Sequence, residues 1–328
     1  MYNVEIIGTG SFVPEHKVTN DDLAKIVDTS DEWISQMTGI KERRITIKEG
    51  TTDMAVNAAK LALEDAGVAA SEIELIIVGT VTADYYFPST ACLVQAALGA
   101  TGATSFDIGA GCTGFIYALS VANQFIRTGM YKTALVISAE VLSKITDWTD
   151  RSTCVLFADG AGAAVVRRSE EEGIINIYTG AEGDYQEYLA CVAAPLGNYF
   201  MEVQKTEPKQ TYMNGKEVYK FAVKSIPECV LKVLEGTGYT LDDIKWFIPH
   251  QANTRIIDVA AKKLGIAIEK FHLILHKYGN TSGASIPIAL DEMARTGLLE
   301  PGDLFIIVGF GAGFTYGAQL VRWTKAKA

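Results

Sequence analysis

The sequence is poor in the features that mark several common classes of protein. Its 328 residues include only 8 prolines, 4 histidines and 5 cysteines, and the formal net charge is −10. An acidic chain is a poor match for nucleic acid, because phosphate binding depends on a basic surface. A local basic patch for one acidic partner is still compatible with this charge. We therefore expect no nucleic acid partner.

The cysteines fit neither a disulfide framework nor a zinc site. They are odd in number, scattered and without any CxxC pair: Cys92, Cys112, Cys154, Cys191 and Cys229. This usage indicates a reducing compartment. The opening residues MYNVEIIGTG lack the basic and apolar segments of a signal peptide, and no uncharged apolar run approaches the roughly 18 residues that span a bilayer. We expect a cytoplasmic protein that binds neither a metal nor a membrane.

Two parts of the chain resemble each other at a spacing of 171 residues. Gly67 and Gly238 each end an expected helix (238 − 67 = 171), and Ala118 recurs as Ala289 (289 − 118 = 171). Each glycine is followed by a polar turn and then by an expected β-branched strand. A period of this length far exceeds the roughly 20–50 residues of a solenoid repeat. The pattern predicts two related halves.

The halves would span residues 1–170 and 171–328 and share one body, because no Pro- or Ser-rich linker separates them. The apolar runs at 134–140 (ALVISAE) and 304–310 (LFIIVGF) are typical of strands buried on both faces of a sheet that helices cover. The predicted fold class is therefore α/β. In such folds ligands bind at the carboxyl ends of strands.

Cys112 lies where an expected strand, a glycine turn and a helix meet, in TSFDIGAGCTGFIYALSVANQFI. The unpaired N–H groups and the positive end of a helix dipole stabilise an anion at such a position. We expect the pKa of the Cys112 thiol to lie below its free value of about 8.5, which would favour nucleophilic attack. Cys92 and Cys229 fall within apolar helical patterns and are expected to be small buried residues.

The second half offers a histidine and an asparagine at matching places. His250 ends the expected strand IKWFIP and opens an expected helix, HQANTRIIDVAAKKLG. Asn280 lies in KYGNTSGASIPIAL, the counterpart of the cysteine turn, in which Gly283 falls opposite Cys112 (283 − 112 = 171). One half thus supplies a nucleophile, and the other supplies an imidazole and an amide.

The cysteine turn also supports a different interpretation. Residues 109–114, GAGCTG, fit the G-x-G-x-x-G pattern between a strand and a helix, and Glu140 closes the next strand as the acidic residue of a dinucleotide site would. Against this, the motif lies about 100 residues into the chain, and a thiol stands where a pyrophosphate needs room. An NAD-dependent oxidoreductase stays open as an alternative.

Several segments together resemble one enzyme family. GAGCTGF, IPHQANTRI, KYGNTSGASIP and GFGAGFTYG, with GTGSFVPE, DTSDEWI and FADGAGAAVV, are similar to segments of β-ketoacyl-acyl-carrier-protein synthase III, and the likeness runs nearly from end to end. The resemblance implies a duplicated thiolase-like fold with an α-β-α-β-α layered body, and a homodimer. It also implies that the chain joins an acyl-CoA starter to malonyl-acyl-carrier protein with loss of carbon dioxide, the first step of bacterial type II fatty acid synthesis.

The resemblance implies that Cys112, His250 and Asn280 are the catalytic residues. Cys112 would accept the acyl group, while backbone N–H groups of Cys112 and Ala312 would stabilise the oxyanion. His250 and Asn280 would donate hydrogen bonds to the malonyl thioester carbonyl. Decarboxylation supplies the carbanion, so no cofactor is expected, and CoA enters only as the thioester substrate.

The same resemblance implies two sets of binding residues. The CoA set is Trp33, Thr38, Arg151, Gly215, Ala252 and Asn253. The carrier-protein set is Gln251, Ala252, Asn253, Thr254, Arg255, Lys262 and Lys263. Met37 replaces an arginine that is usual in the family, which predicts weaker CoA binding. A related condensing enzyme of a specialised ketide pathway stays open, because the motifs do not determine which acyl group is used.

Overall fold

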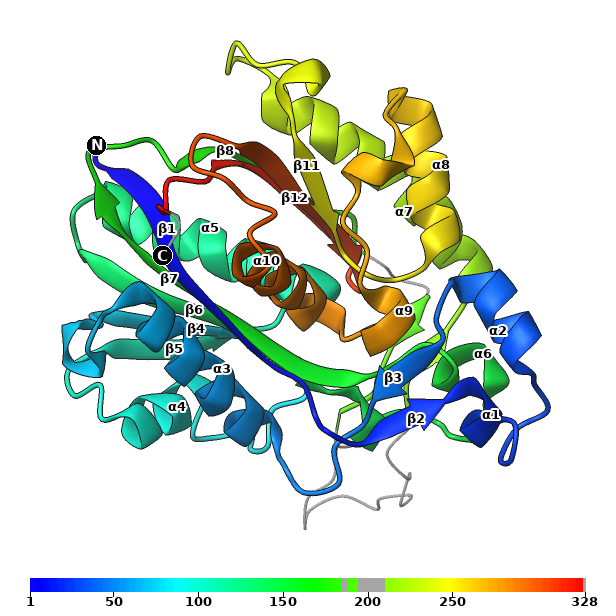
Figure 1. Ribbon diagram of the computed structural model, residues 1–328. Coiled ribbons are helices and arrows are strands. Elements are labelled where there is room, and N and C mark those ends of the chain that lie inside the picture. Colours follow the sequence, from blue (N-terminus) through cyan, green and yellow to red (C-terminus); the bar gives the residue numbers. More distant parts are fainter. Residues whose placement is uncertain (184–187, 194–209, 327–328) are drawn as a thin grey trace.

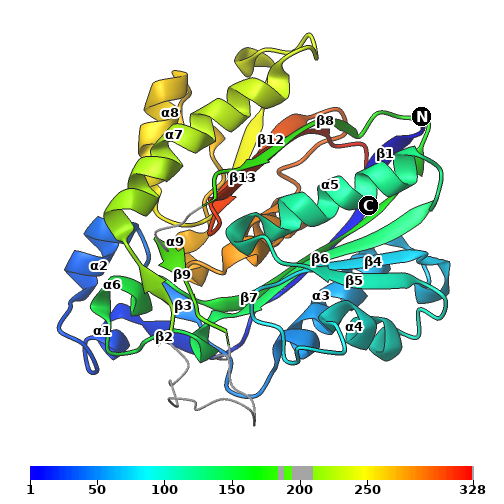
Figure 2. The same ribbon diagram turned by 180° about the vertical axis from the view of Figure 1, so that it is seen from behind.

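The computed structural model describes residues 1–183, 188–193 and 210–326. Two large β-sheets are stacked with a layer of helices between them, and further helices cover their outer faces, so that the layers follow the order helix, sheet, helix, sheet, helix (Figures 1 and 2). The predicted α-β-α-β-α body is confirmed. No helix in the described ranges is long and apolar enough to cross a membrane.

The larger sheet contains, in spatial order, β1 (Asn3–Phe12), β7 (Asp159–Ser169), β6 (Thr133–Val141), β4 (Leu75–Gly79) and β5 (Thr104–Ile108). Strand β4 runs parallel to both β5 and β6, whereas β7 is antiparallel to β1 and β6. The middle of this sheet is apolar because helices bury both of its faces.

The smaller sheet contains β8 (Ile174–Ala181), β13 (Thr315–Arg322), β12 (Leu304–Gly311) and β11 (Trp246–Pro249), again in spatial order. Strand β13 is antiparallel to both of its neighbours, and β11 runs parallel to β12. The carboxyl ends of β11 and β12 therefore point the same way, which brings the residues after them to one edge of the sheet.

The two sheets repeat one plan at the spacing seen in the sequence. Strands β1 and β8 begin 171 residues apart (174 − 3), as do β6 and β12 (304 − 133) and β4 and β11 (246 − 75). Corresponding neighbours also pair in the same sense. The duplication is thus visible in the topology, while its boundary at residues 170 and 171 stays a prediction.

The layer between the sheets consists of α5 (Gly114–Arg127) and α10 (Ser285–Arg295), which also begin 171 residues apart (285 − 114). Both helices pack against strands of both sheets in one continuous apolar core. A 3-10 turn precedes each helix: η2 (Gly111–Thr113) before α5 and η6 (Ser282–Ala284) before α10. The two turns contact each other, so the functional turns of both halves meet in the centre of the molecule.

The outer layers are α3 (Thr51–Ala66) with α4 (Thr90–Leu98) on the larger sheet, and α7 (Gly215–Leu234) with α8 (Thr254–Leu264) on the smaller one. Helix α3 ends at Gly67, whose φ of 63° is the left-handed conformation that favours glycine. The matching prediction for Gly238 is wrong, because α7 ends four residues earlier, at Leu234 (238 − 234 = 4).

A smaller lobe lies beside the end of the sheets that faces α8 (Figure 1). Its elements are α1 (Asn20–Leu23), α2 (Asp31–Thr38), α6 (Arg151–Cys154), α9 (Leu275–Tyr278), β2 (Lys17–Thr19) and β3 (Glu42–Arg44). They share a small apolar core of their own. The remaining short elements are β9 (Leu189–Ala190), β10 (Tyr212–Met213), η1 (Ala70–Glu72), η3 (Leu142–Lys144), η4 (Leu241–Asp243) and η5 (Ile268–Lys270).

Candidate active site

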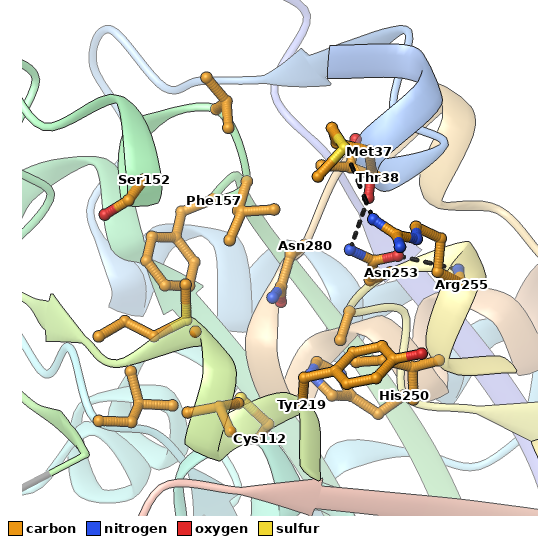
Figure 3. A pocket seen from close by; sticks show the side chains of 18 of the residues that line it. Met37, Thr38, Cys112, Ser152, Phe157, Tyr219, His250, Asn253, Arg255 and Asn280 are labelled. Carbon is orange, nitrogen blue, oxygen red and sulfur yellow. Dashed lines mark hydrogen bonds between the residues drawn. The ribbon is translucent and has the colours of Figure 1, made fainter. Parts of the chain in front are cut away.

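Two cavities meet at Cys112. The first cavity, of 290 Å³, is lined by Cys112, His250 and Asn280 and extends to the exposed Arg255 (Figure 3). Trp33 also lines it. The second cavity, of 480 Å³, shares Cys112 with the first and has a largely apolar lining: Val81, Leu142, Ile145, Phe157, Leu189 and Val192. The structure therefore brings the three predicted catalytic residues to one cavity, and Cys112 also lines a second one.

Cys112 lies in η2, directly before α5, and is 9% exposed. The end of β12 approaches it so closely that a Cβ atom at Gly311 would lie 2.6 Å from the Cys112 nitrogen. Glycine at this position is what allows the turn after β12 to reach the start of α5. The GAGCTG turn at Cys112 and the turn that follows β12 thereby form one site.

Hydrogen-bond donors surround the Cys112 sulfur. The Ser282 hydroxyl donates to Sγ at 3.4 Å, and the backbone N–H groups of Cys112 and Ala312 also interact with the thiol. Donors placed in this way stabilise negative charge on the sulfur or on an oxygen that forms beside it. The two residues predicted for the oxyanion hole thus lie together.

The prediction of a lowered pKa for Cys112 is wrong. Burial raises the pKa of this thiol to about 11, because the low-dielectric interior disfavours the thiolate. The Ser282 hydrogen bond and the backbone N–H groups lower the pKa, but by less than burial raises it, and the carboxyl of Glu140 raises it further. The thiol therefore keeps its proton at neutral pH, and the surrounding donors act on the charge that develops during attack.

His250 directly follows β11, where its backbone N–H donates to the Val308 carbonyl at 2.8 Å. The side chain is 1% exposed, and its Nδ1 lies 2.8 Å from the Ser285 hydroxyl. Burial lowers the pKa of His250 to about 3, with a backbone hydrogen bond of Ser282 acting in the opposite direction. The imidazole is therefore uncharged at neutral pH. Helix α8 begins only at Thr254, so the expected helix does not include His250.

Asn280 is held in place through its backbone and its side chain. Its N–H donates to the Leu156 carbonyl at 3.0 Å, and its carbonyl accepts from Ala158 at 2.9 Å. Its Oδ1 accepts the Ser282 N–H at 2.9 Å. Because the amide oxygen is occupied, the Nδ2 group is the part of the side chain left for the first cavity, which Asn280 lines.

The residues expected to bind CoA lie at the first cavity. Five of them line it: Trp33, Thr38, Gly215, Ala252 and Asn253. Arg151 reaches the same place from α6, with its guanidinium 4.9 Å from the centre of the Trp33 ring. Met37 also lines the cavity, and its sulfur lies 3.5 Å from Nη1 of Arg255.

The expected carrier-protein residues are divided between surface and interior. Arg255, Lys262 and Lys263 are exposed on α8, and Thr254 is half-buried at its start. Gln251 is 1% exposed, and its amide is bonded to backbone groups of Pro249, His272, Ile274 and Leu275. The Gln251 side chain therefore has an internal structural role, and the place of Gln251 in the carrier set stays a prediction.

Sequence reasoning missed Ser282 and Ser285, which contact Cys112 and His250. A signal was available, since both belong to the turn that follows Asn280 and matches the cysteine turn. Cys92 was also misjudged, because it is exposed on α4 instead of buried. Cys229 is buried as expected.

Glu140 does not have the surroundings of a nucleotide-binding carboxylate. It is fully buried, and it accepts hydrogen bonds from the Val81 N–H at 3.1 Å, from the Thr80 hydroxyl at 3.3 Å and from the Thr82 hydroxyl. The carboxyl group thus holds the segment after β4 and offers no oxygen to a ribose. This geometry argues against the oxidoreductase alternative.

Comparison with known proteins agrees with the geometry. A family model described as 3-oxoacyl-[acyl-carrier-protein (ACP)] synthase III matches residues 106–183, and the model of its C-terminal part matches residues 234–323. A β-ketoacyl-[acyl-carrier-protein] synthase III of Clostridium acetobutylicum is 54% identical over 99% of this chain and 100% of its own. The chain belongs to the β-ketoacyl-[acyl-carrier-protein] synthase III family. The resemblance noted in the sequence is confirmed.

Solved structures support the same conclusion. The synthase III of Aquifex aeolicus is 49% identical and covers 98% of this chain and 100% of its own, with a TM-score of 0.92. A priming β-ketosynthase from the R1128 polyketide pathway is 35% identical and covers 99% of this chain and 97% of its own, with a TM-score of 0.93. The fold is thiolase-like, and the chain is a condensing acyltransferase of the synthase III family.

Proposed function

We propose that this synthase III transfers the acyl group of a short acyl-CoA such as acetyl-CoA to Cys112 and condenses it with malonyl-acyl-carrier protein. The products would be CoA, carbon dioxide and a 3-oxoacyl-acyl-carrier protein, which initiates type II fatty acid synthesis. The observation that carries the proposal is that Cys112, His250 and Asn280 line one cavity, which also reaches the expected CoA residues.

In the first half-reaction, Cys112 Sγ attacks the thioester carbonyl of acyl-CoA. A new C–S bond forms, the bond to the CoA sulfur breaks, and the thiol proton leaves with CoA. The backbone N–H groups of Cys112 and Ala312 and the Ser282 hydroxyl are the donors that would stabilise the transient oxyanion. The largely apolar second cavity offers space for the acyl group.

In the second half-reaction, the malonyl thioester carbonyl accepts hydrogen bonds from a ring N–H of His250 and from Nδ2 of Asn280. The bond to the malonyl carboxylate breaks, carbon dioxide leaves, and the electron pair passes into the enolate. The enolate carbon attacks the acyl carbonyl, the C–S bond to Cys112 breaks, and the leaving thiolate takes up one proton from solvent. These steps move only electron pairs and protons, so the proposed reaction requires no redox or metal cofactor.

The entrance to the first cavity has the chemistry that CoA requires. Trp33 and Arg151 present a flat ring and a guanidinium, an arrangement that suits adenine. Thr38, Gly215, Ala252 and Asn253 would line the path of the pantetheine arm. Met37 itself supplies no charge, but Arg255 Nη1 lies beside its sulfur. Arg255 therefore places a cation near the position where the family usually has an arginine.

We also propose that the enzyme is a cytoplasmic homodimer. Phe87 is 86% exposed and adjoins the exposed Tyr85 and Tyr86, a group of aromatic side chains that a partner subunit would cover. None of the five cysteines forms a disulfide, in agreement with a reducing compartment.

The substrate test is a panel of acyl-CoA esters followed by malonyl-acyl-carrier protein, with mass spectrometry of the intact enzyme and of the carrier. We expect an acyl-enzyme with acetyl-CoA and a 3-oxobutyryl carrier afterwards. The similarity to the R1128 priming ketosynthase makes a specialised ketide pathway the second candidate. Acylation by longer acyl-CoA esters without acylation by acetyl-CoA would favour that candidate over the primary pathway.

Lys262→Glu is expected to raise the KM for malonyl-acyl-carrier protein at least about threefold at low ionic strength, because an acidic carrier loses a screened attraction to α8. The KM for acetyl-CoA should not change, since Lys262 does not line the first cavity. Lys262 is a better probe than Arg255, which contacts Met37 at the CoA entrance.

The matched control is Lys60→Glu, which makes the same charge change on α3 in the opposite outer layer. Both variants should be assayed with carrier concentration varied at low and at high salt. An equal effect of the two substitutions would mean that only net charge matters and that α8 is not the docking surface.

A further inference from the structure

Two serines of one turn contact two different catalytic side chains. Ser282, in η6, donates to the Cys112 sulfur at 3.4 Å, and Ser285, the first residue of α10, lies 2.8 Å from Nδ1 of His250. Both serines are buried. A buried hydroxyl can either donate to an imidazole nitrogen or accept from it, so the other hydrogen bonds of the hydroxyl determine which ring nitrogen carries the proton.

The hydrogen bonds around Ser285 favour one arrangement. The Gln251 backbone N–H donates to Ser285 Oγ at 3.2 Å, so this oxygen already accepts one bond. If Nδ1 of His250 carried the proton, it would also donate to this oxygen, and the hydroxyl proton would need a different acceptor. Leaving a buried donor unpaired costs about 1–3 kcal/mol. If Nδ1 is unprotonated, the Ser285 hydroxyl donates to it, and Nδ1, the hydroxyl and the Gln251 N–H all have partners.

The position of the proton on the His250 ring matters because the ring is uncharged. Burial keeps His250 uncharged at neutral pH, so the ring carries a single proton. With that proton on Nδ1, the other nitrogen would present a lone pair to the substrate carbonyl, and the two would repel each other. With the proton on Nε2, the same nitrogen donates to the carbonyl oxygen.

We propose that Ser285 is a positioning residue that keeps the His250 proton on Nε2, so that His250 can donate to the malonyl thioester carbonyl. The inference rests on the proposed function of His250 in decarboxylation. Ser285 itself need not touch substrate, since it does not line either cavity. It acts on the second half-reaction only, whereas the Ser282 hydroxyl acts on the thiol and hence on the first.

The direct test is nitrogen NMR of the enzyme labelled with ¹⁵N-histidine, with the His250 signals assigned by comparison with His250→Ala. We expect the wild-type protein to show the Nε2–H tautomer at pH 7. In Ser285→Ala, we expect a mixture that contains the Nδ1–H form. A wild-type spectrum with the proton on Nδ1 would overturn the proposal, whatever the variants do.

Kinetics supply the second readout. Ser285→Ala should lower the kcat of condensation about 10- to 100-fold, the usual effect of removing a residue that orients a functional histidine. Acylation by acetyl-CoA, followed by intact mass, should stay within about threefold of the wild type. Ser282→Ala is the matched control: it should slow acylation and leave the His250 tautomer unchanged.

The outcomes separate the inference from the proposed function. Normal condensation by His250→Ala would disprove the role of the imidazole itself. If His250→Ala fails to condense while Ser285→Ala condenses within twofold of the wild type, His250 keeps its role and only the part given to Ser285 is wrong. If Ser285→Ala loses acylation and condensation to the same extent, Ser285 has only a structural role, and the proposal is overturned as well.

Discussion

Incubation with acetyl-CoA is expected to place one acetyl group on Cys112 and none on the other cysteines. Cys112 is the thiol toward which the N–H of Ala312 and the Ser282 hydroxyl are directed. Cys92 and Cys191 are exposed, so accessibility alone would favour them. Selective acylation of a buried thiol would therefore show that stabilisation of the transition state, and not exposure, determines the site.

Peptide mapping of the acetylated enzyme measures this directly. Cys112→Ala should lower overall condensation at least about 10³-fold, the scale of losing a catalytic nucleophile. Cys191→Ser is the informative control, because Cys191 lines the second cavity next to Cys112 and its loss should leave acetylation intact. An acetyl group found on Cys191 in the wild type would reassign the nucleophile.

In His250→Ala and Asn280→Ala, we expect the first half-reaction to proceed and the second to fail. Both variants should form the acyl-enzyme at close to the wild-type rate, because neither side chain donates to the Cys112 sulfur in the structure. Each should then lose about 10²- to 10³-fold in decarboxylation and condensation, the scale for removing one oxyanion donor. Single-turnover mass spectrometry and release of labelled carbon dioxide measure the two steps separately.

Two controls sharpen this prediction. Asn280→Asp keeps an oxygen for the Ser282 N–H but has no side-chain N–H, so it should be as defective in condensation as Asn280→Ala. His276→Ala removes an exposed histidine that lines neither cavity and should change neither step. Full condensation by both His250→Ala and Asn280→Ala would refute the assigned role.

The fold could be predicted from the sequence to the extent that it depends on local pattern and repetition. The 171-residue spacing is visible in pairs such as Ala118 and Ala289, and it reappears as the equal starts of α5 and α10. The runs at 134–140 and 304–310 are apolar at consecutive positions, so both faces of each strand must be buried. This pattern predicts helices on both sides of each sheet. The end of α7 could not be predicted from the sequence around Gly238, because it depends on how the last turn packs against the rest of the molecule.

The candidate site, too, could be predicted from the sequence only in part. The catalytic residue types and their places after strands follow from the glycine turns and from the family resemblance. The contacts of Ser282 and Ser285 could not be predicted, because each partner lies in a different turn of the chain and meets its serine only through the packing of the two halves. The burial of Gln251 was missed for the same reason, since a polar residue after a strand end usually faces solvent.

The sequence by itself determined the family, the duplicated α/β plan and the identity of the residues at the centre of the site, because these depend on residue type and spacing along the chain. Only the tertiary structure decided how those residues ionise. The position of Cys112 before a helix predicts a lowered pKa. In the folded protein Cys112 is buried, and burial raises its pKa to about 11. Desolvation depends on every atom packed around a group, and most of those atoms come from parts of the chain that are distant in sequence.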